Sequence, residues 1–166
     1  MNEITLNPGR FDPYKNYKFR VKWDGQYIPG ITRVSSLSRT TDVVQVQEGV
    51  NPDTSRKTTG MTRFGIITLE RALTGDLAFE KWADLVWKLG AGLGAGITRM
   101  EFRKDVVIEL YNETGHLVRA YKAYRCWPSH YQALSGLDAG NNALLVERLE
   151  LECEGWQRDL SVTEIA

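Results

Sequence analysis

The chain has 166 residues, of which 42% are hydrophobic and 25% charged, and 21 basic residues balance 21 acidic ones. This size and composition predict one soluble globular domain over residues 1–166, with enough chain for a hydrophobic core. Zero net charge gives no reason to expect nucleic acid, which asks for a clustered basic face, and it offers little protection against self-association. The apolar runs are far shorter than the roughly 20 residues that span a bilayer, so we expect no membrane anchoring.

The first part of the chain predicts an arm followed by short strands. Residues 1–16 are rich in turn signals and read as an N-terminal arm without a signal-peptide core. Residues 17–23 alternate between apolar and basic side chains, as a half-buried strand does. Asp24-Gly25 is a strong hairpin signal, and a return strand starts at Gln26. Residues 31–39 are rich in Ser and Thr and predict an extended strand with a bend.

A long polar stretch then separates two further strands. Residues 43–47 place Val44 and Val46 on one face, and residues 64–69 are expected to form the partner strand. Between them, residues 48–63 show no secondary-structure signal. So long a connection in a compact domain usually means function or disorder. Because strands flank it, we expect an extended hairpin loop that projects from the body.

One helix is expected over residues 76–89, with Thr74 or Asp76 accepting hydrogen bonds from its first turn and Gly90 following its C-cap. Its apolar stripe, at helical spacing, consists of Phe79, Trp82, Ala83 and Val86. Its polar side consists of Glu80, Lys81, Asp84 and Lys88. Residues 90–96 read GAGLGAG and predict a flexible glycine-rich linker.

The C-terminal half predicts three more strands. Residues 106–110 and 117–126 are joined by a turn, Pro128 ends the second strand, and residues 144–156 form the last long strand. On that last strand Glu150, Glu152 and Glu154 lie opposite the leucines. The total is about seven or eight strands and one helix, which predicts a mainly β fold: an antiparallel sandwich or barrel with a flanking helix.

The sequence offers no catalytic constellation, cofactor motif or metal site. The glycine cluster follows a helix and lacks the Lys-Ser or Lys-Thr of a phosphate loop. Cys126 and Cys153 suit buried thiols better than a disulfide, and no Cys-x-x-Cys pair supports zinc binding with His130. The carboxylates Glu147, Glu150, Glu152 and Glu154 are interpreted as a solvated face rather than as acid–base groups. We therefore expect no enzyme.

An ordered set of segments resembles the tail tube protein family of contractile phages and the inner tube proteins of contractile injection systems, which have the Hcp-like tube fold. The resemblance is carried by Asp12-Pro13-Tyr14, Val34 to Arg39, Val46 to Gly49, Arg56-Lys57, Gly60, Thr62, Ile67 to Leu69, Leu73 to Leu77, the Trp82 helix, Tyr131 to Asp138 and Glu147 to Glu154. It implies a non-enzymatic structural subunit of stacked hexameric rings. Such a tube is driven through a target envelope by sheath contraction and delivers DNA or effectors.

The resemblance also implies partners and roles for individual residues. The partners would be further copies of the chain, a sheath protein, baseplate hub or tube-initiator proteins, terminator proteins, and a cargo without specific binding. Assembly would take place in the bacterial cytoplasm, and the product would be a virion tail or an injection particle. Ring-to-ring contacts are expected from Arg39, Glu48, Asn51, Arg56, Lys57 and Arg63. The lumen would be lined by Glu150, Glu152 and Glu154, and the polar side of the helix would face the sheath.

Two alternatives remain at this point. A monomeric β-sandwich that binds a ligand or protein through its loop predicts a stable monomer. An enzyme predicts a pocket with convergent polar groups, for which the sequence supplies no candidates. Within the tube family, the sequence does not separate a phage tube from an injection-system tube.

Overall fold

The computed structural model describes residues 18–47, 49, 55–92 and 102–163. Within these residues the chain forms ten strands and one helix. They are β1 (Lys18–Trp23), β2 (Gln26–Tyr27), β3 (Ile31–Val34), β4 (Arg39–Gln47), β5 (Ser55–Phe64), β6 (Ile67–Ala72), α1 (Ala78–Gly90), β7 (Lys104–Tyr111), β8 (Leu117–Gln132), β9 (Val146–Glu152) and β10 (Gly155–Arg158). The expected N-terminal arm, most of the glycine-rich linker, Glu48 and Asn51 lie outside the described residues.

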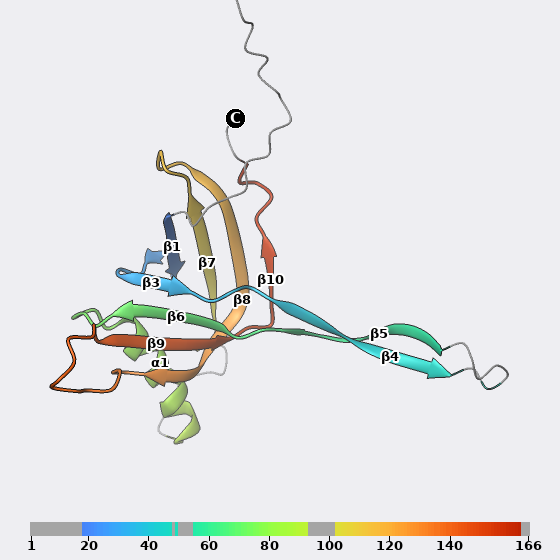
Figure 1. Ribbon diagram of the computed structural model, residues 1–166, viewed down its shortest axis with the longest axis horizontal. Coiled ribbons are helices and arrows are strands. Elements are labelled where there is room, and N and C mark those ends of the chain that lie inside the picture. Colours follow the sequence, from blue (N-terminus) through green and yellow to red (C-terminus); the bar gives the residue numbers. More distant parts are fainter. Residues whose placement is uncertain (1–17, 48, 50–54, 93–101, 164–166) are drawn as a thin grey trace, which may run out of the picture.

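Eight of the strands form one antiparallel sheet that is bent into two layers. The order is β2-β1-β7-β8-β9-β6-β3, and β10 also pairs with β8. The strands β1, β7 and β10 run across the direction of β3, β6 and β9, and the long strand β8 belongs to both layers (Figure 1). A strand that changes layer in this way is the usual corner of an orthogonal sandwich. The mainly β, antiparallel fold with one helix is therefore confirmed.

Irregular pairing allows β8 to turn this corner. Its register shifts between the partners of Lys104 and Val106, and again between Pro128 and His130. Arg125 lies within the first of these shifts with φ of 50°, and its N–H donates to Asp105 Oδ1 at 3.0 Å. Bulges increase local twist and bend a strand, and they also accommodate proline. The prediction that Pro128 ends this strand is wrong for that reason.

The core lies between the two layers and is closed by α1. Trp23 of β1 packs against Phe79 and Trp82 of the helix, with ring centroids 6.0 and 4.8 Å apart. The indole N–H of Trp82 donates to the Phe102 carbonyl at 2.7 Å, so this large side chain is buried with its polar atom satisfied. Leu149 and Leu151 of β9 complete the core from the other layer.

The helix begins two residues after the predicted start and ends one residue after the predicted end. Asp76 Oδ1 accepts the N–H of Ala78 at 2.9 Å, which confirms the expected role of that carboxylate at the first turn. Gly90, expected just beyond the C-cap, is the last helical residue, and Gly92 takes the positive φ of 71° instead. The Asp24-Gly25 turn is confirmed, since Trp23 pairs with Gln26 and both turn residues have positive φ. The last strand, expected to be continuous, is interrupted between β9 and β10.

Candidate functional site

The most prominent surface feature is a two-stranded arm formed by β4 and β5. It forms a sheet of its own and projects from the bent sheet (Figure 1). The expectation of a loop over residues 48–63 is wrong for residues 55–63, which belong to β5 and pair with β4 from Ser55 to Phe64. The predicted partner strand is also corrected, because β6 pairs with β3 and β9 rather than with β4.

The arm continues the β3–β6 pair beyond the edge of the body. Its base is fixed by Trp156 of β10, whose ring lies 6.2 Å from that of Phe64 and 5.5 Å from the Arg39 guanidinium carbon. The Trp156 indole N–H also donates to the Ser38 carbonyl at 3.3 Å. The arm therefore leaves the body in a defined direction.

The pairing register gives the two faces of the arm different chemistry. Val46 pairs with Arg56 and Val44 with Thr58, so Val44, Val46 and Arg56 share one face, which we call the valine face. Gln45 pairs with Lys57 on the opposite face. The sequence grouped Arg56 with Lys57 as one contact set, but the register separates them.

A bulge and an ion pair shape the inner half of the arm. The register shifts between Thr41 and Val43, and a Cβ at Gly60 would lie 3.1 Å from both Cβ and the carbonyl oxygen of Asp42. Any larger residue here would have to displace the opposite strand by a few tenths of an ångström. Arg63 donates to Asp42 Oδ2 at 2.9 Å, so this predicted contact residue is engaged within the arm itself.

The arm exposes more apolar surface than a solvated ribbon needs. Val43 is 65% exposed, Met61 69%, and both valines of the valine face are more than two-fifths exposed. An isolated two-stranded hairpin is only marginally stable in water. The arm therefore has the composition of a surface that is completed by another protein.

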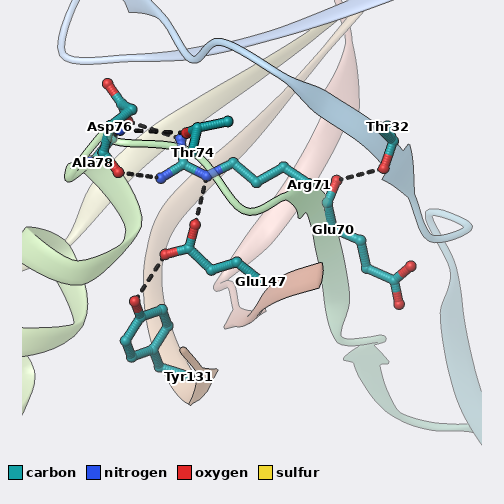
Figure 2. A network of polar contacts seen from close by, with 8 residues as sticks. All are labelled: Thr32, Glu70, Arg71, Thr74, Asp76, Ala78, Tyr131 and Glu147. Atoms are coloured by element: carbon teal, nitrogen blue, oxygen red, sulfur yellow. Dashed lines mark hydrogen bonds and ion pairs between the residues drawn. The ribbon is translucent and has the colours of Figure 1, made fainter. Parts of the chain in front are cut away.

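A buried ionic network ties the sheet to the helix on the opposite side of the body (Figure 2). Arg71 of β6 is fully buried. It donates from Nε to Glu147 Oε2 at 2.7 Å, from Nη1 to Asp76 Oδ1 at 2.8 Å, and from Nη2 to the Asp76 carbonyl at 2.8 Å. Tyr131 donates from its hydroxyl to Glu147 Oε1 at 2.8 Å, and the guanidinium lies over the Phe79 ring at 4.2 Å. Every member is satisfied by another, which is the condition for a stabilising buried network.

This network corrects the expectation that Glu147 belongs to a solvated face. Its strand alternates, and Glu147 falls in phase with Leu149 and Leu151 on the buried side. Arg71 likewise falls in phase with Ile67 and Leu69. Each of the two strands has one charged residue in phase with its core positions, and this pattern in the sequence could have indicated a buried ion pair. The pairing of Arg71 with Glu147 is not apparent from the sequence because the two residues are 76 positions apart.

The network predicts a loss of stability in acid. The hydrogen bond from Arg71, and then that from the Ala78 N–H, lower the pKa of Asp76 below its ordinary value. A carboxylate with a lowered folded-state pKa stabilises the fold above its unfolded pKa of about 3.9, and this contribution disappears as pH falls through the folded-state pKa. We expect the urea midpoint to fall between pH 5 and pH 3.

Asp76→Asn is the matched control for this acid effect, because its side-chain oxygen still accepts the Ala78 N–H but carries no charge. The variant is expected to be less stable than the native chain at pH 7 and to lose less stability over the same interval. An unchanged pH dependence in Asp76→Asn would assign the effect to other carboxylates. The chief one is Glu109, where burial raises the pKa but hydrogen bonds from Tyr111, Lys22 and Tyr27 outweigh it and lower the net pKa.

The remaining predicted residues lie on surfaces that differ in charge balance. Glu150 and Glu152 are half-buried on the outer face of β9. Glu154 lies beyond the strand and forms ion pairs with Arg103 and with Arg125, so the acidic face is partly neutralised. All four residues of the helix's polar side are exposed: Glu80, Lys81, Asp84 and Lys88.

Other sequence features have local structural roles. Cys126 is buried and Cys153 half-buried, and both thiols are free. His116 is exposed, with Nδ1 2.9 Å from the Thr114 hydroxyl. In the part of the chain that the structure describes, no three His, Cys, Asp or Glu side chains are grouped as metal ligands would be. The same residues include no helix with the length and apolar character needed to cross a bilayer.

The structure is that of a mainly β domain whose bent antiparallel sheet carries a projecting, partly apolar two-stranded arm. The model of the T4-like virus tail tube protein gp19 family matches residues 15–157. The chain therefore belongs to this family and is a structural subunit of a contractile-tail tube.

Solved structures agree with this family. A chain of the anti-feeding prophage (AFP) baseplate, determined with six-fold symmetry, is 25% identical with a TM-score of 0.67, over 89% of this chain and 96% of that one. A chain of the PVC extracellular contractile injection system sheath–tube complex is 21% identical with a TM-score of 0.70, over 89% and 91%. A chain of the AFP tube-terminating cap is 21% identical with a TM-score of 0.73, over 95% and 99%. The last two similarities concern the fold alone. Among curated protein sequences, none matches the chain.

Proposed function

We propose that this subunit forms hexameric rings that stack into the inner tube of a contractile phage tail or a phage-tail-like injection particle, with the arm making the ring-to-ring contacts. The observation that carries the proposal is the arm: a partly apolar, solvent-exposed ribbon whose base is held by Trp156. Head-to-tail contacts that close produce rings, and stacking along the axis produces a tube. The six-fold symmetrised AFP baseplate chain, at 25% identity, supports the ring number.

Among the proposed contact residues, Arg56 and Lys57 are the best candidates for a ring-to-ring contact. Both are exposed on the arm, and neither has an ion-pair partner among the described residues. Arg39 and Arg63 act at the base, where they order the arm through Trp156 and Asp42. Glu48 and Asn51, which lie outside the described residues, complete the proposed set.

Two further surfaces that are not part of the core, the outer face of β9 and the polar side of α1, are also given proposed roles. The outer face of β9, with Glu150 and Glu152, and the nearby Glu154 are proposed to line the lumen, since negative walls do not retain a DNA cargo. The exposed polar side of α1 is proposed to face the sheath. Baseplate initiators and a terminator would bind the two ends of the stack, assembly would occur in the bacterial cytoplasm, and the subunit would have no enzymatic activity.

Negative-stain electron microscopy of the purified chain at low and high concentration tests this proposal. Six-fold rings, or hollow tubes with a regular axial repeat, are the expected result. A stable monomer at every concentration, also in the presence of a tube-initiating baseplate protein, would favour the monomeric binding module instead.

Charge reversal on the arm provides a residue-level prediction. Arg56→Glu combined with Lys57→Glu should leave a folded subunit that stacks poorly, because both side chains are solvent-exposed and unpaired within the described part of their own chain. We expect an unchanged circular dichroism spectrum and at least about a tenfold loss of sedimenting tubes, the scale of one lost charge-assisted contact. Reversing Glu80 and Lys81 on α1 is the matched control and should leave tube yield unchanged. Tubes of normal length from the arm variant would refute the ring-to-ring role of these cations.

A further inference from the structure

The loop between β8 and β9 exposes a second apolar surface, which we call the leucine loop (residues 133–145). Leu137 is 71% exposed and Leu144 72% exposed. Two largely exposed leucines within 13 residues are a higher local density of exposed apolar side chains than the single, scattered ones of an ordinary surface. Nothing among the described residues of the same chain covers them.

The leucine loop is ordered by its own hydrogen bonds. The Ser135 N–H donates to the Val146 carbonyl, and the Val146 N–H donates to the Ser135 hydroxyl, both at 3.0 Å. Asp138 Oδ1 accepts the Gly140 N–H at 2.9 Å, and the Leu73 N–H donates to the Leu145 carbonyl at 3.0 Å. The loop is therefore a preformed surface, and binding there requires little further ordering.

A hollow of about 410 Å³ lies in this loop, lined by Leu137, Asp138, Asn141, Leu145 and three small residues. Gly136 has no side chain and that of Ala139 is a single methyl group, so neither fills the hollow. The hollow therefore combines the apolar side chains of Leu137 and Leu145 with one carboxylate, that of Asp138. Asp138 has no cationic partner among the described residues.

The leucine loop and the arm lie at opposite ends of the same strand pair. The base of the arm precedes Ile67, which pairs with Leu151 at one end of β6 and β9. The leucine loop enters β9 at Val146, which pairs with Ala72 at the other end. The arm points away from the loop in Figure 1. One chain therefore cannot bring its own arm to its own leucine loop, but a second copy placed head to tail can.

The chemistry of the valine face matches that of the hollow. Val44 and Val46 are 44% and 43% exposed and lie beside Arg56, a cation that has no ion-pair partner within the described ranges. At the same level the opposite face of the arm offers Gln45 and Gln47, and its exposed valine, Val43, lies nearer the base of the arm. The valine face thus presents apolar side chains beside one cation, and the hollow presents apolar side chains beside one carboxylate, so the two surfaces are complementary.

We propose that the leucine loop of one subunit is the docking site for the arm of the next subunit, with Val44 and Val46 against the loop leucines and Arg56 paired with Asp138. The inference rests on the proposed function, because it names the acceptor surface for the arm. Each subunit carries one arm and one acceptor, so the contact repeats from copy to copy. Heterologous contacts of this kind propagate along an assembly.

A charge-swap experiment tests the pairing. Arg56→Asp and Asp138→Arg are each expected to reduce sedimenting tubes about tenfold, and the double swap is expected to restore native yield within about twofold. The matched control combines Lys57→Asp, on the other face of the arm, with Asp138→Arg, and should not recover. A double swap no better than the poorer single variant would overturn the inference. All substitutions are on exposed residues, so thermal melting should change little, although Asp138→Arg removes the hydrogen bond from the Gly140 N–H.

Crosslinking tests the apolar part of the contact without changing charge. Val46→Cys with Leu137→Cys, treated with a short bismaleimide, is expected to give a ladder of covalent oligomers from assembled tubes. Wild-type chain and Val46→Cys with Lys81→Cys are the controls and should give none. If the wild-type chain forms tubes, but the Val46→Cys and Leu137→Cys variant gives no ladder and the double charge swap gives no rescue, this inference alone is overturned. Failure of the wild-type chain to form rings or tubes would overturn the proposed function.

Discussion

Arg71→Met is expected to lower the free energy of unfolding by about 3–5 kcal/mol, the usual cost of removing one partner from a buried ion pair. The guanidinium of Arg71 is fully buried and makes three hydrogen bonds, two to Asp76 and one to Glu147. Its removal leaves the Glu147 carboxylate buried with only the Tyr131 hydroxyl to stabilise its charge. Urea denaturation at pH 7, followed by tryptophan fluorescence, measures the change.

Arg148→Met is the matched control for Arg71→Met. Arg148 also comes from the β6–β9 pair and donates to Glu70 Oε1 at 2.7 Å, but its side chain is 39% exposed. An exposed pair of this kind contributes about 0–1 kcal/mol. Adding Glu147→Leu to Arg71→Met should recover part of the lost stability, since the stranded buried charge is then removed. Equal losses in Arg71→Met and Arg148→Met would show that burial of the network adds nothing.

Removal of the arm is expected to abolish tube formation and leave the body folded. Arg39 pairs directly with Phe64, and the Gly65 N–H donates to the Ser38 carbonyl at 2.8 Å. Replacing residues 40–63 with Asn-Gly therefore closes a two-residue hairpin at the base of the arm. The arm and its cations are lost, whereas the Trp156 contacts at its base are retained.

Two measurements separate assembly from folding in the armless variant. Its melting temperature should stay within a few degrees of that of the native chain, because no described residue of the arm belongs to the hydrophobic core. Sedimentation velocity should show no species larger than a single ring at concentrations where the native chain forms tubes. Tubes of the armless variant would contradict the arm's role, whereas a molten body would show that the arm is part of the folding unit.

The buried network also bears on the mechanics of a tube. It joins β6, β9, β8 and the start of α1 through Arg71, Glu147, Tyr131 and Asp76 (Figure 2). The end of the sheet that it stiffens also carries the leucine loop, which follows β8 and precedes β9. A mechanical load transmitted between stacked subunits through the proposed arm-to-loop contact would therefore act on the end of the domain that the Arg71 network stabilises.

The local elements follow from the sequence alone, because each is set by near neighbours along the chain. Period-two alternation places Val21 and Trp23 on the core face of β1, and Asp24-Gly25 fixes the turn to β2. Helical spacing identifies the buried face of α1 at Phe79 and Trp82. Together with the ordered family resemblance, these signals were enough to predict the mainly β fold and the tube family.

Features that depend on distant partners were decided only by the tertiary structure. Residues 55–63 form a strand because β4 supplies their hydrogen bonds, and both faces are exposed, so no alternation of apolar residues marks them. Glu147 is buried because folding brings Arg71 to it across two strands. β8 continues through Pro128 because bulges turn it from one layer to the other. Hydrophobic periodicity reports whether a face is buried, but only the fold determines which charged or polar groups meet there.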